Sequence, residues 1–153
     1  MSFDPARLRR TDLLVAIGAV ALFVFLFFLP WYGVGPFTID GWHGHTILRW
    51  FMLATIALAA SYVVLQATQR TPAMPAAIGA VLVIVAFITV WPVAWRVIID
   101  EPGPNGLVSV KPGAWLGLAA CVWLVYAGYR ALRDERIPRA KPVEPIHRPL
   151  ASS

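Results

Sequence analysis

The sequence is short of charge. Asp, Glu, Lys and Arg make up 14% of its 153 residues, whereas apolar residues make up 59%. A soluble domain carries about a quarter charged residues and spreads its apolar residues at amphipathic spacing. Here the apolar residues gather into four long blocks, and blocks of about 18 or more predict bilayer-spanning helices. These proportions argue against a soluble globular domain.

Cysteine and lysine are also nearly missing. The single cysteine, Cys121, lies inside an apolar block, so an intrachain disulfide is excluded. Four-helix membrane oxidoreductases that relay electrons through cysteine pairs are excluded for the same reason. Lys111 and Lys141 are the only lysines, and the remaining basic residues are arginines. That bias, with abundant Ala and Pro, suggests a bacterial protein from a GC-rich genome.

The predicted spans have no charged residue or histidine near their centres. Proton-coupled transporters and pumps need such groups at membrane depth, and membrane cytochromes need histidines within helices. Small multidrug exporters rely on a glutamate in their first helix, which residues 13–29 lack. We find no nucleophile motif, Walker loop or dinucleotide turn. We therefore expect no enzymatic activity and no cofactor.

The predicted fold is an all-α integral membrane protein, a bundle of four transmembrane helices. A cleaved signal peptide is the alternative for the first block, which follows a basic start. That block is long for a signal peptide, and Leu29-Pro30-Trp31-Tyr32 after it offers no small-residue cleavage site. The predicted spans are residues 13–29, 47–67, 75–99 and 114–132.

The connecting segments are rich in turn-forming residues. Residues 30–46 contain several Gly and Pro and are expected to form a loop. Residues 102–106 form a second turn cluster, and Leu107–Val110 could form a short strand. Residues 1–12 form a polar start, and the basic, Pro-containing tail 133–153 is predicted to be disordered.

The basic residues predict the orientation, because cytoplasmic segments collect Lys and Arg. With both termini in the cytoplasm, the three outer basic residues Arg49, Arg96 and Lys111 are balanced by outer acids. The basic residues that give the net charge of +5 therefore flank the predicted spans. This placement argues against nucleic acid as a partner and for the plasma membrane. The predicted cytoplasmic basic residues are Arg7, Arg9, Arg10, Arg70, Arg130, Arg133, Arg136, Arg139, Lys141 and Arg148.

Tryptophans collect at the predicted outer ends of the spans. Indole rings favour the headgroup region, where an apolar body and one N–H donor are both accommodated. Interfacial anchoring is the simpler interpretation, and an outer face that binds a partner or lipid is the sharper one. The residues concerned are Trp31, Trp42, Trp50, Trp91, Trp95 and Trp115.

Arg49 and Arg96 lie near the same ends. A charge in hydrocarbon is costly, so we expect each to reach the interface or pair with an acid. Arg96 has Asp100 one turn later, whereas Arg49 has Asp40 or Glu101 as possible loop partners. The functional alternative is a site in which both arginines bind a phosphate or carboxylate beneath the tryptophans.

Two further patterns call for explanation. Small residues recur on the fourth span and predict close helix packing, within the bundle in preference to a dimer seam; they are Gly113, Gly117, Cys121 and Gly128. Asp40, His43 and His45 are weak candidates for zinc or copper ligands, because an H-x-H pair without a second cluster is unspecific. We expect these histidines to be exposed in the loop.

Three short motifs carry a resemblance. Phe28-Leu29-Pro30-Trp31-Tyr32, Gly41-Trp42 and residues 112–118 (PGAWLGL) resemble uncharacterised small four-helix membrane proteins of actinobacteria. The resemblance implies the four-helix topology and no catalytic residue. A weaker likeness is to the architecture of claudin-type proteins, whose outer loops form a small sheet. This likeness implies a small β element in which Phe37–Ile39 could pair with Leu107–Val110, although the paired loop cysteines of that family are missing here.

These observations lead to two functional hypotheses. The first is a non-enzymatic membrane protein that contacts lipid or a partner protein, or a second copy of itself, through its Trp-rich outer face. The alternative is a small transporter, or a transporter subunit, for an anionic or lipid-like solute that uses Arg49 and Arg96. A membrane enzyme ranks last, because no acid, base or metal cluster lies at membrane depth.

Overall fold

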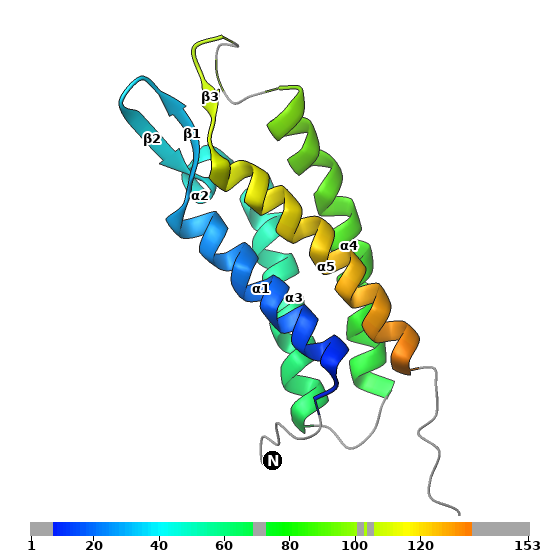
Figure 1. Ribbon diagram of the computed structural model, residues 1–153. Coiled ribbons are helices and arrows are strands. Elements are labelled where there is room, and N and C mark those ends of the chain that lie inside the picture. Colours follow the sequence, from blue (N-terminus) through cyan, green and yellow to red (C-terminus); the bar gives the residue numbers. More distant parts are fainter. Residues whose placement is uncertain (1–7, 69–72, 101–102, 104–105, 136–153) are drawn as a thin grey trace, which may run out of the picture.

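Four long helices dominate the computed structural model, which describes residues 8–68, 73–100, 103 and 106–135. They are α1 (Arg10–Phe28), α3 (Leu48–Thr68), α4 (Ala73–Ile98) and α5 (Pro112–Glu135). Each is long and apolar enough to cross a membrane. The helices run alternately up and down, and α5 packs against both α1 and α4 while α3 packs against α4 and α1 (Figure 1).

The helices start and end close to the predicted bounds, with differences that have local causes. The first helix begins at Arg10, three residues before the predicted span, because Asp12 accepts a hydrogen bond from the Arg9 backbone N–H at 2.8 Å. At the other end, α5 continues through Arg133 to Glu135. The first three residues of the predicted disordered tail are therefore helical, and residues 136–153 lie outside the described part of the chain.

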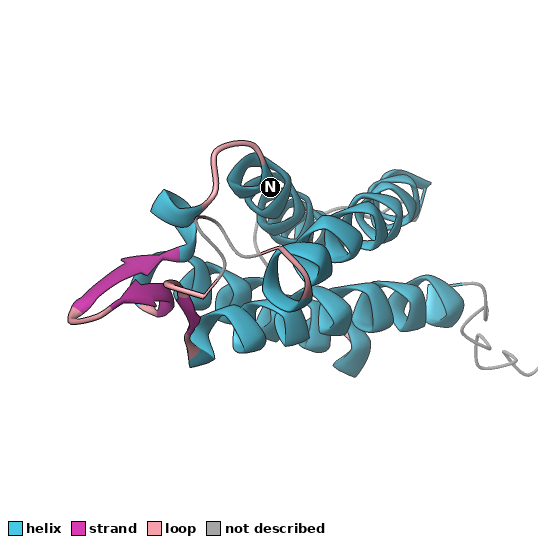
Figure 2. Ribbon diagram, turned by 90° about the horizontal axis from the view of Figure 1, so that it is seen from above, coloured by secondary structure: helices cyan, strands magenta, loops and turns pink. Residues whose placement is uncertain are grey.

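A three-stranded antiparallel sheet caps one end of the bundle, which we call the sheet end (Figure 1). Its strands are β1 (Pro30–Val34), β2 (Phe37–Asp40) and β3 (Ser109–Val110), in the order β2-β1-β3. Seen from above, the strands extend to one side of the helices (Figure 2). The described ends of α1 and α5 that lead to the termini lie at the opposite end of the bundle.

The predicted pairing of the two loop segments was wrong, although both segments join a sheet. Phe37 pairs with Val34 across a two-residue turn, in which Gly35 adopts a φ of +57° that suits glycine. Because the turn is so short, β2 pairs with β1. The strand β3 pairs with the other edge of β1, where Val110 lies opposite Tyr32. The rest of the first loop is also more regular than predicted, since α2 (Gly41–Gly44) is a short helix.

Each long helix buries one narrow stripe and leaves large apolar side chains exposed elsewhere. On α1, Val15 and Leu22 are fully buried, whereas Ile17 and Val20 are more than half exposed. A helix that is apolar on all sides suits a bilayer and would aggregate in water. Two buried hydroxyls inside the bundle pair across helices, those of Thr55 and Thr89, which lie 3.2 Å apart between α3 and α4.

Candidate functional site at the sheet end

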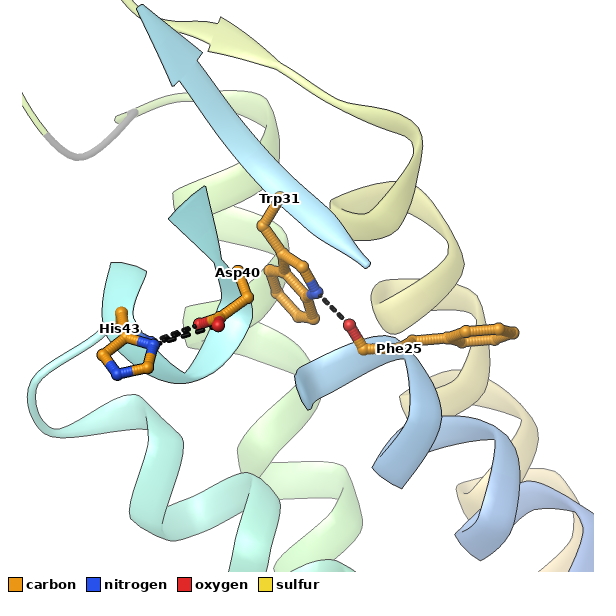
Figure 3. Close-up of polar contacts among 4 residues, drawn as sticks. All are labelled: Phe25, Trp31, Asp40 and His43. Atoms are coloured by element: carbon orange, nitrogen blue, oxygen red, sulfur yellow. Dashed lines mark hydrogen bonds and ion pairs between the residues drawn. The ribbon is translucent and has the colours of Figure 1, made fainter. Parts of the chain in front are cut away.

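Trp31 on β1 joins the sheet to the bundle. Its indole is fully buried, and Nε1 donates a hydrogen bond to the Phe25 carbonyl oxygen at 2.6 Å (Figure 3). That carbonyl lies in the last turn of α1, so the hydrogen bond ties the ring directly to the end of that helix. The ring is enclosed by two glycines: a Cβ on Gly41 would lie 2.6 Å from it, and a Cβ on Gly117 would overlap it.

The burial of Trp31 corrects its predicted role as an outer-face binding residue. It is a core residue that holds the start of the sheet against α5, and it offers no surface to a ligand. Sequence reasoning placed Gly117 in a helix-packing stripe and did not connect it with Trp31. The sequence shows a tryptophan and several glycines in separate segments. That information does not indicate which glycine contacts the tryptophan ring.

Arg49, Trp42 and Trp50 form a cluster that we call the Arg49 cluster. The Arg49 guanidinium carbon lies 5.1 Å from the Trp42 ring centroid and 5.6 Å from that of Trp50. The two indoles meet edge to face at 5.4 Å, and Trp42 stacks on Phe27 at 5.0 Å. Cation–π contacts at these distances stabilise a guanidinium without neutralising it.

No carboxylate neutralises Arg49 among the described residues. Its predicted partner Asp40 instead pairs with His43, and the other predicted partner, Glu101, lies outside the described part of the chain. The Arg49 Nε is buried and has no hydrogen-bond partner. A guanidinium with an unused N–H beside aromatic rings is suited to an anionic group such as phosphate.

The other predicted tryptophans do not join the Arg49 cluster through any ring contact among the described residues. Trp91, on α4, meets Phe87 edge to face at 6.1 Å. Trp95 and Trp115 lie on α4 and α5, and all three indoles are at least half exposed. They therefore form separate contacts around the sheet end, in keeping with interfacial positions.

Arg96 occupies surroundings different from those of Arg49. Its Nη1 lies 3.2 Å from the Asp100 carboxylate, and both side chains are about half exposed. Arg96 also lines a cavity of about 450 Å³ between the start of α3 and the end of α4. The predicted site that shared both arginines is therefore divided into two places.

The Asp40-to-His45 segment forms a helix cap and a buried contact. The Asp40 carboxylate accepts hydrogen bonds from the His43 backbone N–H and pairs with Nδ1 of the same residue, each at 2.8 Å (Figure 3). His43 is exposed as expected, but His45 is buried and its ring meets Trp31 and Tyr32 edge to face. No group of three or more His, Cys, Asp or Glu side chains that could hold a metal occurs among the described residues.

The small residues of α5 serve two different neighbours. A Cβ at Gly113 would overlap the Pro30 carbonyl oxygen, and Gly117 faces Trp31, so both receive the sheet. Gly128 faces α4, where a Cβ would lie 2.9 Å from Val83. Cys121, between them, is fully buried. Gly18 on α1, which the sequence did not single out, allows an equally close approach to α5.

Two features were missed at the opposite end of the bundle. Asp12 is buried in the first turn of α1, and it accepts a hydrogen bond from the Tyr62 hydroxyl at 2.9 Å. Gln66 donates to the same hydroxyl at 2.9 Å, so a polar network joins α1 to α3. Tyr126 and Tyr129 are exposed on α5 towards this end. They are aromatic residues of the kind found at membrane interfaces, and the prediction from tryptophans alone placed none here.

The stability of the protein should decrease as pH is lowered, because of the buried His45. Burial, and then the positive charge of Arg96, lower the pKa of His45 from 6.5 to about 4. Tyr32 and Arg96 are the polar neighbours that face it. Because the unfolded chain takes up a proton below about 6.5 and the folded chain does not until about 4, stability is fully present at neutral pH and declines between those values.

The decline should be on the order of 3 kcal/mol at most. Unfolding in detergent, followed between pH 7.5 and 4, should show a smaller decline for His45→Gln than for the unaltered protein. The matched control is His43→Gln, because His43 is exposed and should leave the slope unchanged. An equal slope in His45→Gln would assign the effect to other groups.

Comparisons with known proteins add no family. Neither protein-family models, nor curated proteins, nor solved structures gave a match to this chain.

Proposed function

We propose that this chain is a multi-pass plasma-membrane protein whose sheet end lies at the outer surface and binds anionic lipid headgroups, without enzymatic activity. The observation that carries the proposal is Arg49, which lies on two indole rings and has a buried N–H that finds no partner in the described part of the chain. Tryptophan rings at the headgroup level and an unneutralised guanidinium match the two halves of a lipid headgroup region, one apolar and one anionic.

The orientation is supported by charge. The sheet end carries Arg49, Arg96 and Lys111, whereas the segments at the opposite end carry ten basic residues in the whole sequence. Cytoplasmic segments are rich in Lys and Arg, so the sheet end is assigned to the outside and both termini to the cytoplasm. Because the described ends of α1 and α5 lie at one end of the bundle, the same orientation serves both termini (Figure 1).

The topology can be tested directly. Alkaline phosphatase, which is active only outside the cytoplasm, should be inactive when fused after Ser153 and active when inserted in the turn at Gly35, and a fluorescent protein that folds only inside should give the reverse. A truncation fusion after Lys111 provides the internal control for an outer position. Activity of phosphatase at the C-terminus would overturn the orientation.

Lipid binding should depend on the Arg49 cluster. After purification in mild detergent, the full-length protein should retain phosphatidylglycerol, and Arg49→Gln should weaken the binding of this lipid at the Arg49 cluster by about tenfold, because a charge-assisted hydrogen bond is lost. Trp42→Ala, which removes one cation–π surface, should lower it less. The measurement is quantitative mass spectrometry of the bound lipid.

Arg130→Gln is the matched control, because Arg130 lies at the opposite end and contacts Tyr126 in a comparable way. It should retain the lipid. If Arg49→Gln and Trp42→Ala also retain it, while a cross-linked partner protein is lost, the sheet end is a protein-docking surface and the lipid proposal fails.

A further inference from the structure

The cavity beside Arg96 has walls of two kinds. It lies between the start of α3 and the end of α4, and its volume is about 450 Å³. Arg96 and His45 provide the charged and polar part of the lining, whereas Ile47, Leu48, Phe51 and Pro92 provide an apolar part. A cavity with one polar and one apolar wall suits an amphiphile better than a free ion.

The polar wall favours an anion. Arg96 is held by Asp100 alone among the described carboxylates, and an ion pair between half-exposed side chains contributes less than about 1 kcal/mol. A phosphate oxygen can therefore compete for the guanidinium. The first turn of α3, which has no acidic residue, adds the positive end of a 21-residue helix to the same wall.

His45 adds a directional group. Its side chain is 4% exposed, its Nε2 lies 3.4 Å from the Tyr32 hydroxyl, and Nδ1 has no hydrogen-bond partner among the described residues. The Tyr32 hydroxyl has one hydrogen, which it can donate either to the Arg96 carbonyl oxygen at 3.3 Å or to His45 Nε2. In the second arrangement Nδ1–H is a donor, and a bound phosphate selects it, because neutral His45 then donates to a phosphate oxygen without having to bind a proton first.

The apolar wall continues onto the outside of the bundle. Ile47, just before α3, Phe51 on α3 and Pro92 on α4 line the cavity and are also exposed. In the proposed orientation this surface faces acyl chains just below the headgroups. A lipid whose phosphate entered the cavity would keep its chains against these side chains and in the bilayer.

We propose that this cavity binds the phosphate group of a phospholipid, with Arg96 and His45 as the polar ligands and the acyl chains lying along α3 and α4. The site is distinct from the Arg49 cluster, although it rests on the same placement of the sheet end at the outer interface. It gives the protein a second lipid, held between two helices instead of on the aromatic surface.

The test uses the full-length protein in detergent micelles and a phosphatidylglycerol that carries a photoactivatable group in its acyl chain. Labelling of α4 around Pro92, located by peptide mass spectrometry, reports this site. Arg96→Gln should weaken the labelling about tenfold, whereas Arg49→Gln should leave it unchanged and reduce only the lipid bound at the Arg49 cluster. Failure of the two proposals is thereby distinguishable.

A variant that is expected to bind the lipid more strongly separates a specific effect on the site from a loss of binding caused by misfolding. Asp100→Asn removes the carboxylate that competes for Arg96, so it should strengthen the labelling of α4 severalfold. Unchanged or weaker labelling in Asp100→Asn, or full labelling in Arg96→Gln, would overturn the proposal. So would displacement of the lipid by millimolar inorganic phosphate, because the cavity would then be a free-anion site.

Discussion

Replacing Gly117 by leucine should prevent the sheet end from closing on the bundle and should leave little folded protein. A single added Cβ at this position already overlaps the buried Trp31 ring. The ring has little room to move, because the Gly41 backbone also lies close to it and a Cβ added there would be only 2.6 Å away. Even Gly117→Ala should cost about 1–3 kcal/mol, which is the usual cost of overpacking a filled core. Leucine adds three further carbons to the same space.

The direction of this effect is opposite to that expected from helix propensity. In an exposed helix interior, glycine to alanine stabilises by about 1 kcal/mol. Ala119→Leu is the control, because Ala119 is exposed on the same helix and should be tolerated. The measurement is the free energy of unfolding in mixed detergent micelles, or the yield of monodisperse protein where unfolding is already complete.

A smaller side chain at position 31 should partly rescue Gly117→Ala. Trp31→Ala alone should cost about 3–5 kcal/mol, because it leaves a cavity and removes the hydrogen bond to the Phe25 carbonyl oxygen. In the double variant the two changes share the same space, so the combined cost should be less than the sum of the single costs. Strict additivity would mean that Gly117 and Trp31 act independently, against the contact described.

Replacing Asp12 by alanine should also be strongly destabilising, at about 2–4 kcal/mol. The carboxylate accepts a hydrogen bond from the Arg9 backbone N–H at the start of α1 and another from the Tyr62 hydroxyl on α3. Its loss removes a helix cap and also the acceptor of the buried Tyr62 hydroxyl. That hydroxyl would still accept the hydrogen bond from Gln66. The free energy of unfolding in mixed micelles reports the change.

Two variants separate the contributions at this end. Tyr62→Phe removes the interhelical hydrogen bond and keeps the cap, so it should cost less than Asp12→Ala. Asp100→Asn is the control for a carboxylate at the surface, where the pair with Arg96 contributes little. If Asp12→Ala proved as mild as Asp100→Asn, the buried network would have no structural role.

How much could be predicted differs between the helices and the sheet end. The four long helices were predictable because each corresponds to one continuous apolar block. Hydropathy identifies such a block from its own residues, without information about the segments that pack against it. The small sheet was expected, yet its strand pairing was not, because a two-residue turn at Gly35 outweighed the more distant pairing between the two loops. Residues 41–44, expected to be loop, form a helix because Asp40 caps it.

The candidate site was predicted only as a set of residue types. Tryptophans and arginines near the span ends pointed to the sheet end of the molecule, whereas their division into the buried Trp31, the Arg49 cluster and the Arg96 cavity was not visible in sequence spacing. His45 was expected to be exposed like His43, since nothing in the H-x-H pattern distinguishes a ring directed towards Tyr32 from one in solvent.

The amino-acid sequence alone determined four apolar helices and the uneven distribution of basic charge, because both depend on composition within short segments and on the surrounding solvent. The tertiary structure decided which polar and aromatic groups are buried. Trp31 meets Gly117, and Asp12 meets Tyr62, only once helices that are distant in the chain lie side by side, and no local pattern encodes which distant side chain will be present at the contact.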